Sequence, residues 1–312
     1  MRPLHIVYIA SAARSGSTIL DIVLGNHPRI ESVGELKEFE RLRWAQNDYC
    51  SCRSRAHDCP YWSPIHEQWT ARLEESDLSS YTAQLGFFLR LKRWRRWAST
   101  AAAADSTFRR FQAQTLALYR TIQEVSGKDI IVDSSKGPGI AYFLSTLPEI
   151  KLSVVHLVRD GRAVAWSSMQ AFKKDERAGV ERDLHAKPAW KTALRWRVTN
   201  SLTEWAVKKG DAVRSIRLRY EDFTADPATE LARVGTFLDE DFSSLVAKAA
   251  AGEEMEIGHK IGGSRIRMQG RIRLKAADDV WRRSMPAASR FQVRLVAGRQ
   301  LAKYGYLAGG GA

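Results

Sequence analysis

The stretch Ser11-Ala12-Ala13-Arg14-Ser15-Gly16-Ser17-Thr18 decides the fold of this chain. It follows an apolar run, residues 4–10, that predicts a short buried strand, and it precedes an apolar segment, residues 19–24, that predicts a helix. A strand, a turn of small residues and a helix together point backbone N–H groups and the positive end of the helix dipole at one anion. Arg14 adds a forked set of donors, but the lysine of a GxxxxGK[ST] phosphate loop is missing. An anion-binding loop and an ordinary strand-to-helix turn are therefore both compatible with this stretch alone.

Composition and charge limit the class of protein. The 312 residues, 44% of them hydrophobic, are enough to bury a large core as one elaborated domain or as two. No apolar run approaches about 18 residues and the N-terminus has no secretory pattern, so we expect a cytoplasmic protein without a membrane span, though contact with a membrane surface stays open. Lysine and arginine number 49 against 35 aspartates and glutamates, a formal net charge of +14. This excess predicts an anionic ligand, an anionic surface or nucleic acid, without choosing among them.

All three cysteines fall within residues 50–59, in the pattern Cys-x-Cys-x6-Cys. Three interpretations are open: structural thiols of a loop, a Cys52–Cys59 disulfide, or a zinc site that recruits His57 or His66 as its fourth ligand. The pattern lacks the paired spacing of a zinc ribbon or knuckle. A disulfide is disfavoured in a reducing cytosol. We therefore expect loop thiols and no metal.

Short apolar strands alternate with helices along most of the chain. Beyond the first strand, we predict strands at residues 30–33, 129–132, 152–158 and 213–218. Helices are predicted at residues 140–147, 189–208 and 227–238. This alternation predicts an α/β fold, a P-loop-like parallel sheet with helices on both faces.

Residues 64–126 interrupt the alternation and predict a mostly helical insertion over the ligand edge of the sheet. Within it, residues 85–97 are basic and aromatic, which would suit nucleic acid or a membrane surface. The simpler interpretation is an amphipathic helix whose tryptophans pack inward or line an acceptor pocket. We predict a single domain over residues 1–308 and a disordered tail at residues 309–312.

Cationic residues follow several of the predicted strands. Arg14, Lys136 and Arg159 each come directly after a strand, and so does Glu35. Because the carboxyl ends of parallel strands meet at one edge of a sheet, these side chains are expected to share one crevice. Desolvating several cations there is costly unless an anionic ligand compensates. With the glycine- and arginine-rich loop 258–271, expected to lack regular structure, they predict a pocket for a ligand that bears two separated anionic groups.

Three segments resemble motifs of the sulfotransferases that use 3′-phosphoadenosine-5′-phosphosulfate (PAPS). Residues 14–18, Arg-Ser-Gly-Ser-Thr, are similar to the loop that binds the 5′-phosphosulfate in that family. Residues 158–164, Val-Arg-Asp-Gly-Arg-Ala-Val, with Ser167 eight residues after the first arginine, resemble the 3′-phosphate motif. Residues 219–223 are similar to the Tyr-Glu-Asp segment of the family. The resemblance extends to about residue 285, apart from the helical insertion.

Within that family the chain resembles the bacterial and tyrosylprotein branch. Arg14 stands where the cytosolic enzymes have a lysine. The resemblance implies that Glu35 takes the place of their histidine base and that Lys136 is a second cation. The tyrosylprotein enzymes commonly have a further arginine twelve residues after the one matched by Arg159, where this chain has Ala171. One contact to the 3′-phosphate is thereby missing from the pattern.

The resemblance implies a PAPS-dependent enzyme that transfers a sulfuryl group in line to a hydroxyl or amine, releases PAP (3′-phosphoadenosine-5′-phosphate) and needs no metal. It implies catalytic roles for three residues: Glu35 as general base, with Arg14 and Lys136 stabilising charge. The implied donor-binding residues come from four loops: Arg14, Ser15, Gly16, Ser17, Thr18, Arg159, Ser167, Tyr220, Ser264 and Arg267.

The acceptor and the oligomeric state are left open by the sequence. A small molecule, a carbohydrate, a lipid or a peptide would each suit a basic, tryptophan-rich lid. A P-loop-type kinase acting on a small molecule would use a similar pocket, but the Walker lysine and an identifiable Mg²⁺ carboxylate are missing. A nucleic-acid or heparin-binding module would explain the charge. Neither alternative explains the spacing of Arg159 and Ser167, so no specific nucleic acid is expected.

Overall fold

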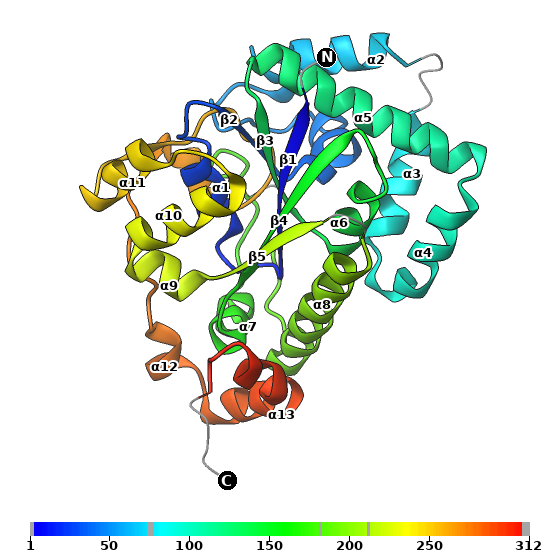
Figure 1. Cartoon of the computed structure of the whole chain (residues 1–312). Coiled ribbons are helices and arrows are strands. Elements are labelled where there is room, and N and C mark those ends of the chain that lie inside the picture. Colours follow the sequence, from blue (N-terminus) through cyan, green and yellow to red (C-terminus); the bar gives the residue numbers. More distant parts are fainter. Residues whose placement is uncertain (1–2, 74–77, 181–182, 211–212, 308–312) are drawn as a thin grey trace.

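A computed structural model describes residues 3–73, 78–180, 183–210 and 213–307. At its centre is a parallel sheet of five strands in the order β2–β3–β1–β4–β5 (Figure 1). The strands are β1 (Leu4–Ser11), β2 (Ile30–Gly34), β3 (Ile130–Lys136), β4 (Ile150–Val158) and β5 (Arg214–Arg219). All five predicted strands and the predicted P-loop-like α/β architecture are confirmed. The predicted tail at residues 309–312 lies outside the described residues.

The first apolar run of the sequence forms β1, the central strand of the sheet. Every residue of β1 is buried, as expected for a parallel strand that is covered on both faces. In the ladder, Ala10 of β1 pairs with Lys136 of β3, and Ser11 pairs with Leu157 of β4. This register brings the loops that follow β1, β3 and β4 to one edge of the sheet.

Helices cover both faces of the sheet (Figure 1). One face carries α1 (Ser17–Leu24), α9 (Tyr220–Ala225), α10 (Pro227–Leu238) and α11 (Ser243–Ala250). The other face carries α6 (Pro138–Leu144), α8 (Ala189–Lys209) and the helical insertion. A third apolar cluster joins α8 to α7 (Gly161–Met169), α12 (Val280–Ser284) and α13 (Ala287–Lys303).

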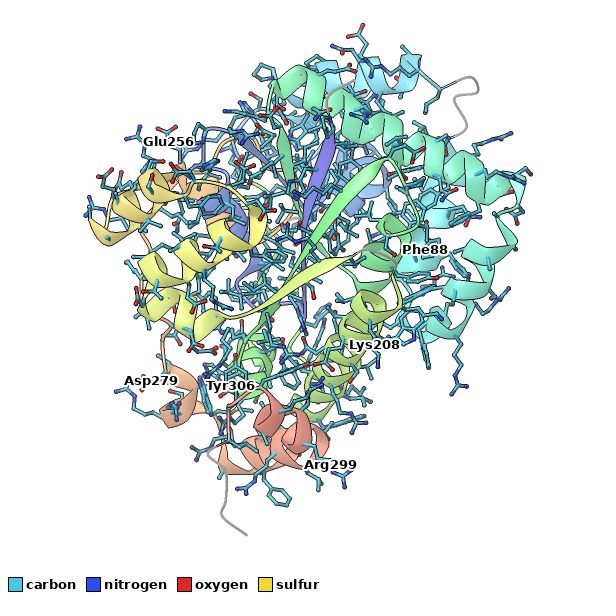
Figure 2. The ribbon with its side chains drawn as sticks, viewed as in Figure 1. Phe88, Lys208, Glu256, Asp279, Arg299 and Tyr306 are labelled. Carbon is cyan, nitrogen blue, oxygen red and sulfur yellow. The ribbon has the colours of Figure 1, made fainter. Side chains whose placement is uncertain are left out.

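The insertion consists of α2 (Trp62–Ala71), α3 (Leu78–Leu89), α4 (Trp94–Ala103) and α5 (Ser106–Ser126). Its aromatic side chains face the protein interior. Phe88 of α3 (Figure 2) lies with its ring centroid 5.2 Å from that of Phe143 of α6, and Trp97 of α4 is fully buried. The expectation that tryptophans of this basic segment pack inward is therefore confirmed for Trp97.

The C-terminal third contains elements that the sequence reading did not identify, namely α11, α12 and α13. The loop 258–271 was expected to lack regular structure, and this is wrong for Arg265–Gln269, which form a short 3₁₀ helix closed by a hydrogen bond of 3.0 Å from Arg267 N to Ser264 O. A small antiparallel sheet of β6 (Met255–Glu256) and β7 (Arg271–Ile272) flanks this loop. Within the described ranges, no helix has the length and apolarity needed to cross a bilayer.

Candidate active site

The turn between β1 and α1 has the conformation expected of an anion-binding loop. Gly16 precedes α1 with φ 87°, and Arg14 has φ 68°, so both lie in the left-handed region. A Cβ at position 16 would lie 2.2 Å from Cε2 of Tyr220, so only glycine fits against this ring. The side chains of Ser15 and Ser17 are buried. The first amides of α1 have no carbonyl partner within the helix, which leaves them available to a ligand at this turn.

Three guanidinium groups gather beside this turn. Arg159 donates from Nη1 to the carbonyl of Arg14 at 3.2 Å, and Arg14 donates from Nη2 to the carbonyl of Ser167 at 3.4 Å. Arg14 and Arg265 both lie over the ring of Phe172, at 5.7 and 4.7 Å from its centroid. Burial lowers the pKa of Arg14, and the positive charges of Arg265 and Arg159 lower it further. Since no described carboxylate pairs with these three groups, their charge favours an anionic ligand.

The Tyr-Glu-Asp segment positions the arginine of the second motif. The guanidinium of Arg159 lies 4.7 Å from the ring centroid of Tyr220, a cation–π contact. Glu221 accepts a hydrogen bond of 3.0 Å from the backbone N–H of Asp160 and one of 2.8 Å from the hydroxyl of Tyr306 (Figure 2). The segment therefore contacts Arg159 through the ring of Tyr220, and it contacts Asp160 through the carboxylate of Glu221.

Glu35 lies at the end of β2 and is paired with two lysines. Its carboxylate forms ion pairs with Lys136 and with Nζ of Lys37, the latter at 2.6 Å. Lys37 also donates from Nζ to the carbonyl of Ser135 at 2.7 Å. Burial opposes ionisation of Glu35, which is 8% exposed, but the two ammonium groups outweigh it and hold the pKa of Glu35 well below its usual range. Burial lowers the pKa of Lys136, although Glu35 opposes that shift.

The C-terminal loop closes over this edge of the sheet. Glu35 donates its backbone N–H to the carbonyl of Ile261 at 3.3 Å, and Ser264 donates its N–H to Oγ1 of Thr18 at 3.2 Å. Gly34 has φ 74°, and a Cβ there would lie 2.9 Å from the carbonyl oxygen of Ile261. The loop therefore contacts both the base candidate and the donor-loop candidate.

Comparison with known proteins identifies the family. The sequence matches the sulfotransferase family over residues 7–244, most of the chain. The chain belongs to the sulfotransferase family. A search of curated protein sequences gives no match.

One solved sulfotransferase structure is similar in fold to this chain, and two others match with lower scores. The sulfotransferase domain of the Synechococcus PCC 7002 olefin synthase has a TM-score of 0.52 at 20% identity, covering 98% of this chain and 96% of that one. The sulfotransferase domain from the curacin biosynthetic pathway has a TM-score of 0.49 at 18% identity, covering 96% and 98%. The sulfotransferase STF9 from Mycobacterium avium has a TM-score of 0.46 at 13% identity, covering 97% and 77%. The first of these supports the assignment of the fold.

In this sulfotransferase, most of the predicted site residues come together. They form three contact groups: Glu35 with Lys136, Arg14 with Arg159 and the backbone of Ser167, and Thr18 with the backbone of Ser264. Tyr220 joins the second group through its ring.

Arg267 lies elsewhere in the loop. It is fully buried and donates to the carbonyls of Gly179 and Tyr49, at 3.3 and 3.5 Å. Arg265, two residues earlier, is the arginine of this loop that lies close to Arg14. The donor-binding role of Arg267 stays a prediction, and Arg265 is a candidate for it that the sequence reading missed.

Two lysines at the site were also missed. Lys37 follows Glu35 by two residues, and this proximity in the sequence was the available clue that a lysine besides Lys136 pairs with Glu35. Lys260 carries an ammonium group 3.0 Å from Asp21, a buried pair that anchors the C-terminal loop to α1. An ion pair between residues so far apart in the sequence has no local pattern by which it could be predicted.

A small cavity of about 20 Å³ adjoins the Lys37 side of the ion pair. Its polar lining consists of Lys37, Thr115, Asp133 and Ser135. The remaining wall is largely apolar and aromatic and comes from α3, α5 and α6: Tyr81, Leu85, Phe111, Tyr119, Ile140, Phe143 and Leu144. Its volume suits a single water molecule.

Proposed function

We propose that this sulfotransferase transfers the sulfuryl group of PAPS to a hydroxyl or amine of an acceptor. The observation that carries the proposal is the uncompensated arginine cluster beside the β1–α1 turn. Two buried polar atoms at the same place, Oγ of Ser15 and Nε of Arg159, have no hydrogen-bond partner among the described residues. Because buried polar atoms are rarely left without partners, both fit a ligand with anionic groups at two points.

The proposed donor site uses the contacts of the three loops. The backbone of residues 15–18 would hold the 5′-phosphosulfate at the start of α1. Arg159 and Ser167 would hold the 3′-phosphate, with Ser264 and an arginine of its loop, for which Arg265 has the better position. When bound, PAPS supplies an activated sulfuryl group on its 5′-phosphate.

Glu35 is proposed as the general base. Its pairing with Lys136 and Lys37 keeps the carboxylate ionised and able to accept a proton, but also makes it a weak base. Anionic donor oxygens would compete for the two ammonium groups, and Glu35 would gain basicity as it loses that pairing. The acceptor proton would pass to Glu35 while the new O–S or N–S bond forms and the sulfur–oxygen bond to the 5′-phosphate breaks. Arg14 and Lys136 would stabilise the charge that develops on the sulfonyl and bridging oxygens.

Four classes of acceptor are compatible with the proposed reaction. The glutamate base and Arg14 support a place in the bacterial and tyrosylprotein branch. Small-molecule, carbohydrate, lipid and peptide acceptors would be distinguished by a PAPS-dependent screen of an extract, with mass detection of products that gain a sulfonate.

Binding of PAP is the direct test of the donor assignment. A ligand that binds only the native state raises the unfolding free energy, so PAP should raise the melting temperature. AMP lacks the 3′-phosphate assigned to Arg159 and Ser167 and should have a much smaller effect at the same concentration. Equal shifts with PAP and AMP would reject the 3′-phosphate site, and no shift with either would reject the donor assignment.

A further inference from the structure

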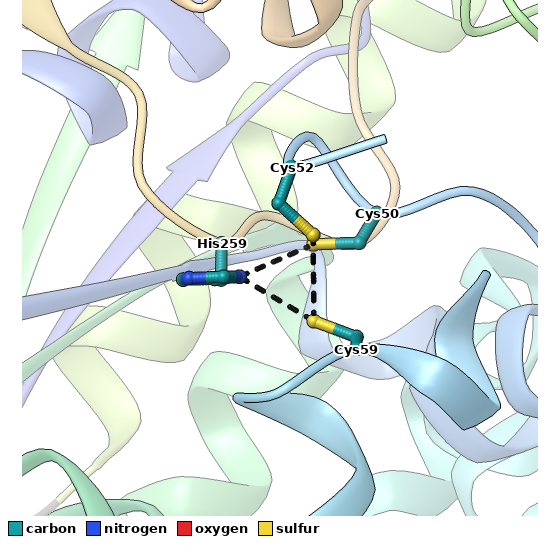
Figure 3. Close-up of side chains that lie close together, drawn as sticks. All are labelled: Cys50, Cys52, Cys59 and His259. Carbon is teal, nitrogen blue, oxygen red and sulfur yellow. Dashed lines mark hydrogen bonds between the residues drawn. The ribbon is translucent and has the colours of Figure 1, made fainter. Parts of the chain in front are cut away.

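We propose that Cys50, Cys52, Cys59 and His259 bind one zinc ion. The three sulfur atoms and a ring nitrogen of His259 all lie within 4.8 Å of one another (Figure 3). His259 comes from the C-terminal loop, and the cysteines come from the segment between β2 and α2. Figure 3 shows the three cysteine side chains and the imidazole directed toward a common centre.

Three of the six separations between the ligand atoms lie close to those of a tetrahedral site. With zinc–sulfur bonds of about 2.3 Å and zinc–nitrogen bonds of about 2.0 Å, the ligand atoms of a regular tetrahedron lie about 3.5–3.8 Å apart. The Cys52 and Cys59 sulfurs are 3.7 Å apart. Nδ1 of His259 lies 3.4 Å from the Cys59 sulfur and 3.9 Å from the Cys50 sulfur. A small adjustment of the side chains would be enough to hold the ion.

The donor set selects the metal and the kind of site. Three thiolates and one imidazole in a tetrahedral arrangement favour zinc, and four protein ligands leave no open position, as in structural zinc sites. Binding would release the protons of the thiols, and three negative thiolates on Zn²⁺ leave a net charge of −1. The imidazole of His259 is held in place by stacking on the ring of Tyr61, at a centroid distance of 5.4 Å. The backbone of His259 is held by a hydrogen bond of 3.2 Å from Nε1 of Trp62 to its carbonyl.

This proposal replaces the expectation of loop thiols without metal. The histidines considered as the fourth ligand are engaged elsewhere: Nε2 of His57 lies 2.9 Å from the Trp44 carbonyl, and Nε2 of His66 lies 3.0 Å from Glu40. His259 lies two hundred residues after Cys59, so the spacing of the cysteines could not identify it. The three cysteines are free thiols, and any one disulfide among them would leave the third sulfur and His259 without their shared centre.

The ion would join the cysteine segment to the loop that closes the active site. Ser51 already donates its N–H to the Lys260 carbonyl at 3.1 Å and accepts from the Lys260 N–H at 2.6 Å. The carbonyl of Ile261, the residue after Lys260, accepts a hydrogen bond from the backbone N–H of Glu35. A zinc ion on His259 would therefore hold the loop in register with the proposed base.

Metal analysis of the full-length protein, purified under reducing conditions, tests the proposal. We expect one zinc per chain in the wild type and almost none in Cys59→Ser or His259→Ala. His57→Ala is the matched control, because it removes a histidine beside the cysteines without touching the cluster, and it should keep its zinc. His259→Cys should restore binding through a fourth thiolate. These measurements do not depend on sulfuryl transfer, so the zinc proposal and the proposed function can fail separately.

Cobalt substitution provides a second measurement on folded wild-type protein. Co²⁺ should give the thiolate charge-transfer and d–d absorption of a tetrahedral sulfur-rich site, and zinc should displace it. A metal chelator should lower the melting temperature of the wild type but not that of His259→Ala. The proposal is overturned if reduced wild-type protein neither contains nor takes up metal, if His259→Ala retains full zinc, if His57→Ala loses it, or if mass analysis finds a Cys52–Cys59 disulfide in the native protein.

Discussion

At the scale of single residues, the pairing of Glu35 determines how this site would work. A carboxylate between two ammonium groups is ionised but weakly basic, whereas a general base is most effective when its pKa lies near the working pH. Ligand binding that draws Lys136 and Lys37 toward anionic oxygens would relieve this mismatch only when the donor is present. Such an arrangement would couple the strength of the base to the occupancy of the donor site.

Replacement of the base tests that role. Glu35→Gln preserves the size of the side chain but cannot accept a proton at neutral pH, so kcat should fall by about 10²–10⁴-fold while PAP affinity stays near that of the wild type. Because the pKa of Glu35 is held low in the free enzyme, the wild-type kcat/KM should show no loss of activity from this group between about pH 5 and 8. Kinetics with the identified acceptor and PAP titration provide both measurements. A near-normal kcat in Glu35→Gln would locate the base elsewhere.

The two proposed cation roles predict different kinetic defects. Contacts to the 3′-phosphate do not change during the reaction, so Arg159→Ala should raise the donor KM and leave kcat almost unchanged. Lys136→Ala should instead lower kcat, because charge near the bridging oxygen develops only in the transition state. Loss of Lys136 also removes one of the two cations that lower the pKa of Glu35, so a loss of activity at acidic pH should appear. A Lys136→Ala variant with a raised donor KM and normal kcat would contradict this assignment.

At the scale of elements, β1, the following turn and α1 act with the Tyr-Glu-Asp segment as one unit. The turn needs a residue without a side chain at position 16, because the Tyr220 ring occupies the place of a Cβ. The same ring lies beneath the guanidinium of Arg159. The segments that would hold the two ends of the donor are thus joined through the Tyr220 ring.

A glycine pair tests this coupling. In Gly16→Ala, the new methyl group must displace the Tyr220 ring, so we expect a loss of about 1–3 kcal/mol in unfolding free energy together with weaker PAP binding. Gly252→Ala is the matched control, since it also has a positive φ, of 64°, but its Cβ would meet nothing within 4 Å. The control should lose about 1 kcal/mol of unfolding free energy, because its positive φ is unfavourable for alanine, and its PAP affinity should stay unchanged. Urea unfolding and PAP titration of both variants give the comparison; equal PAP affinity in the two would show that the turn tolerates a side chain.

What the sequence could predict differs between the strands and the loops. The strands were predictable because a parallel sheet buried on both faces requires continuous apolar runs, and residues that follow such runs, including Arg14 and Lys136, must meet at one edge. Arg265 and His259 were not identified, because their loop has no periodic pattern and its course depends on distant contacts. The buried Lys260–Asp21 pair and the zinc cluster are of this second kind.

At the scale of the whole molecule, two buried histidines make the fold sensitive to acid. Nε2 of His5 lies 2.9 Å from Oγ of Ser153, and Nε2 of His156 lies 3.0 Å from the Asn200 side chain. Burial, as the largest cause, lowers the pKa of each histidine to about 4. Both residues lie on strands of the central sheet, so the cost of charging them falls on the core of the protein rather than on a single loop.

The direction of the pH effect follows from proton binding in the two states. Between pH 6.5, the usual pKa of histidine, and about 4, the unfolded chain binds more protons than the native one, so stability falls as the pH falls. Each histidine should lower the free energy of unfolding by about 2 kcal/mol as the pH falls from about 6.5 to 5. Asp133, whose pKa burial raises to about 6, acts in the opposite direction and partly masks the effect in the wild type.

Replacing both histidines separates their contribution from that of Asp133, which is common to both proteins. Relative to the wild type, His5→Gln/His156→Gln should lose less stability between pH 7.5 and 5, by up to about 4 kcal/mol for the pair. Urea unfolding of the two proteins at both pH values measures this difference directly, whatever the absolute cost of the substitutions at neutral pH. Because zinc binding is itself weakened by acid, the comparison is repeated in the His259→Ala background, where the difference between the histidine pair and its parent should persist. If the two proteins lose stability in parallel on acidification, then these histidines are not held neutral in the native state, and the acid sensitivity has another origin.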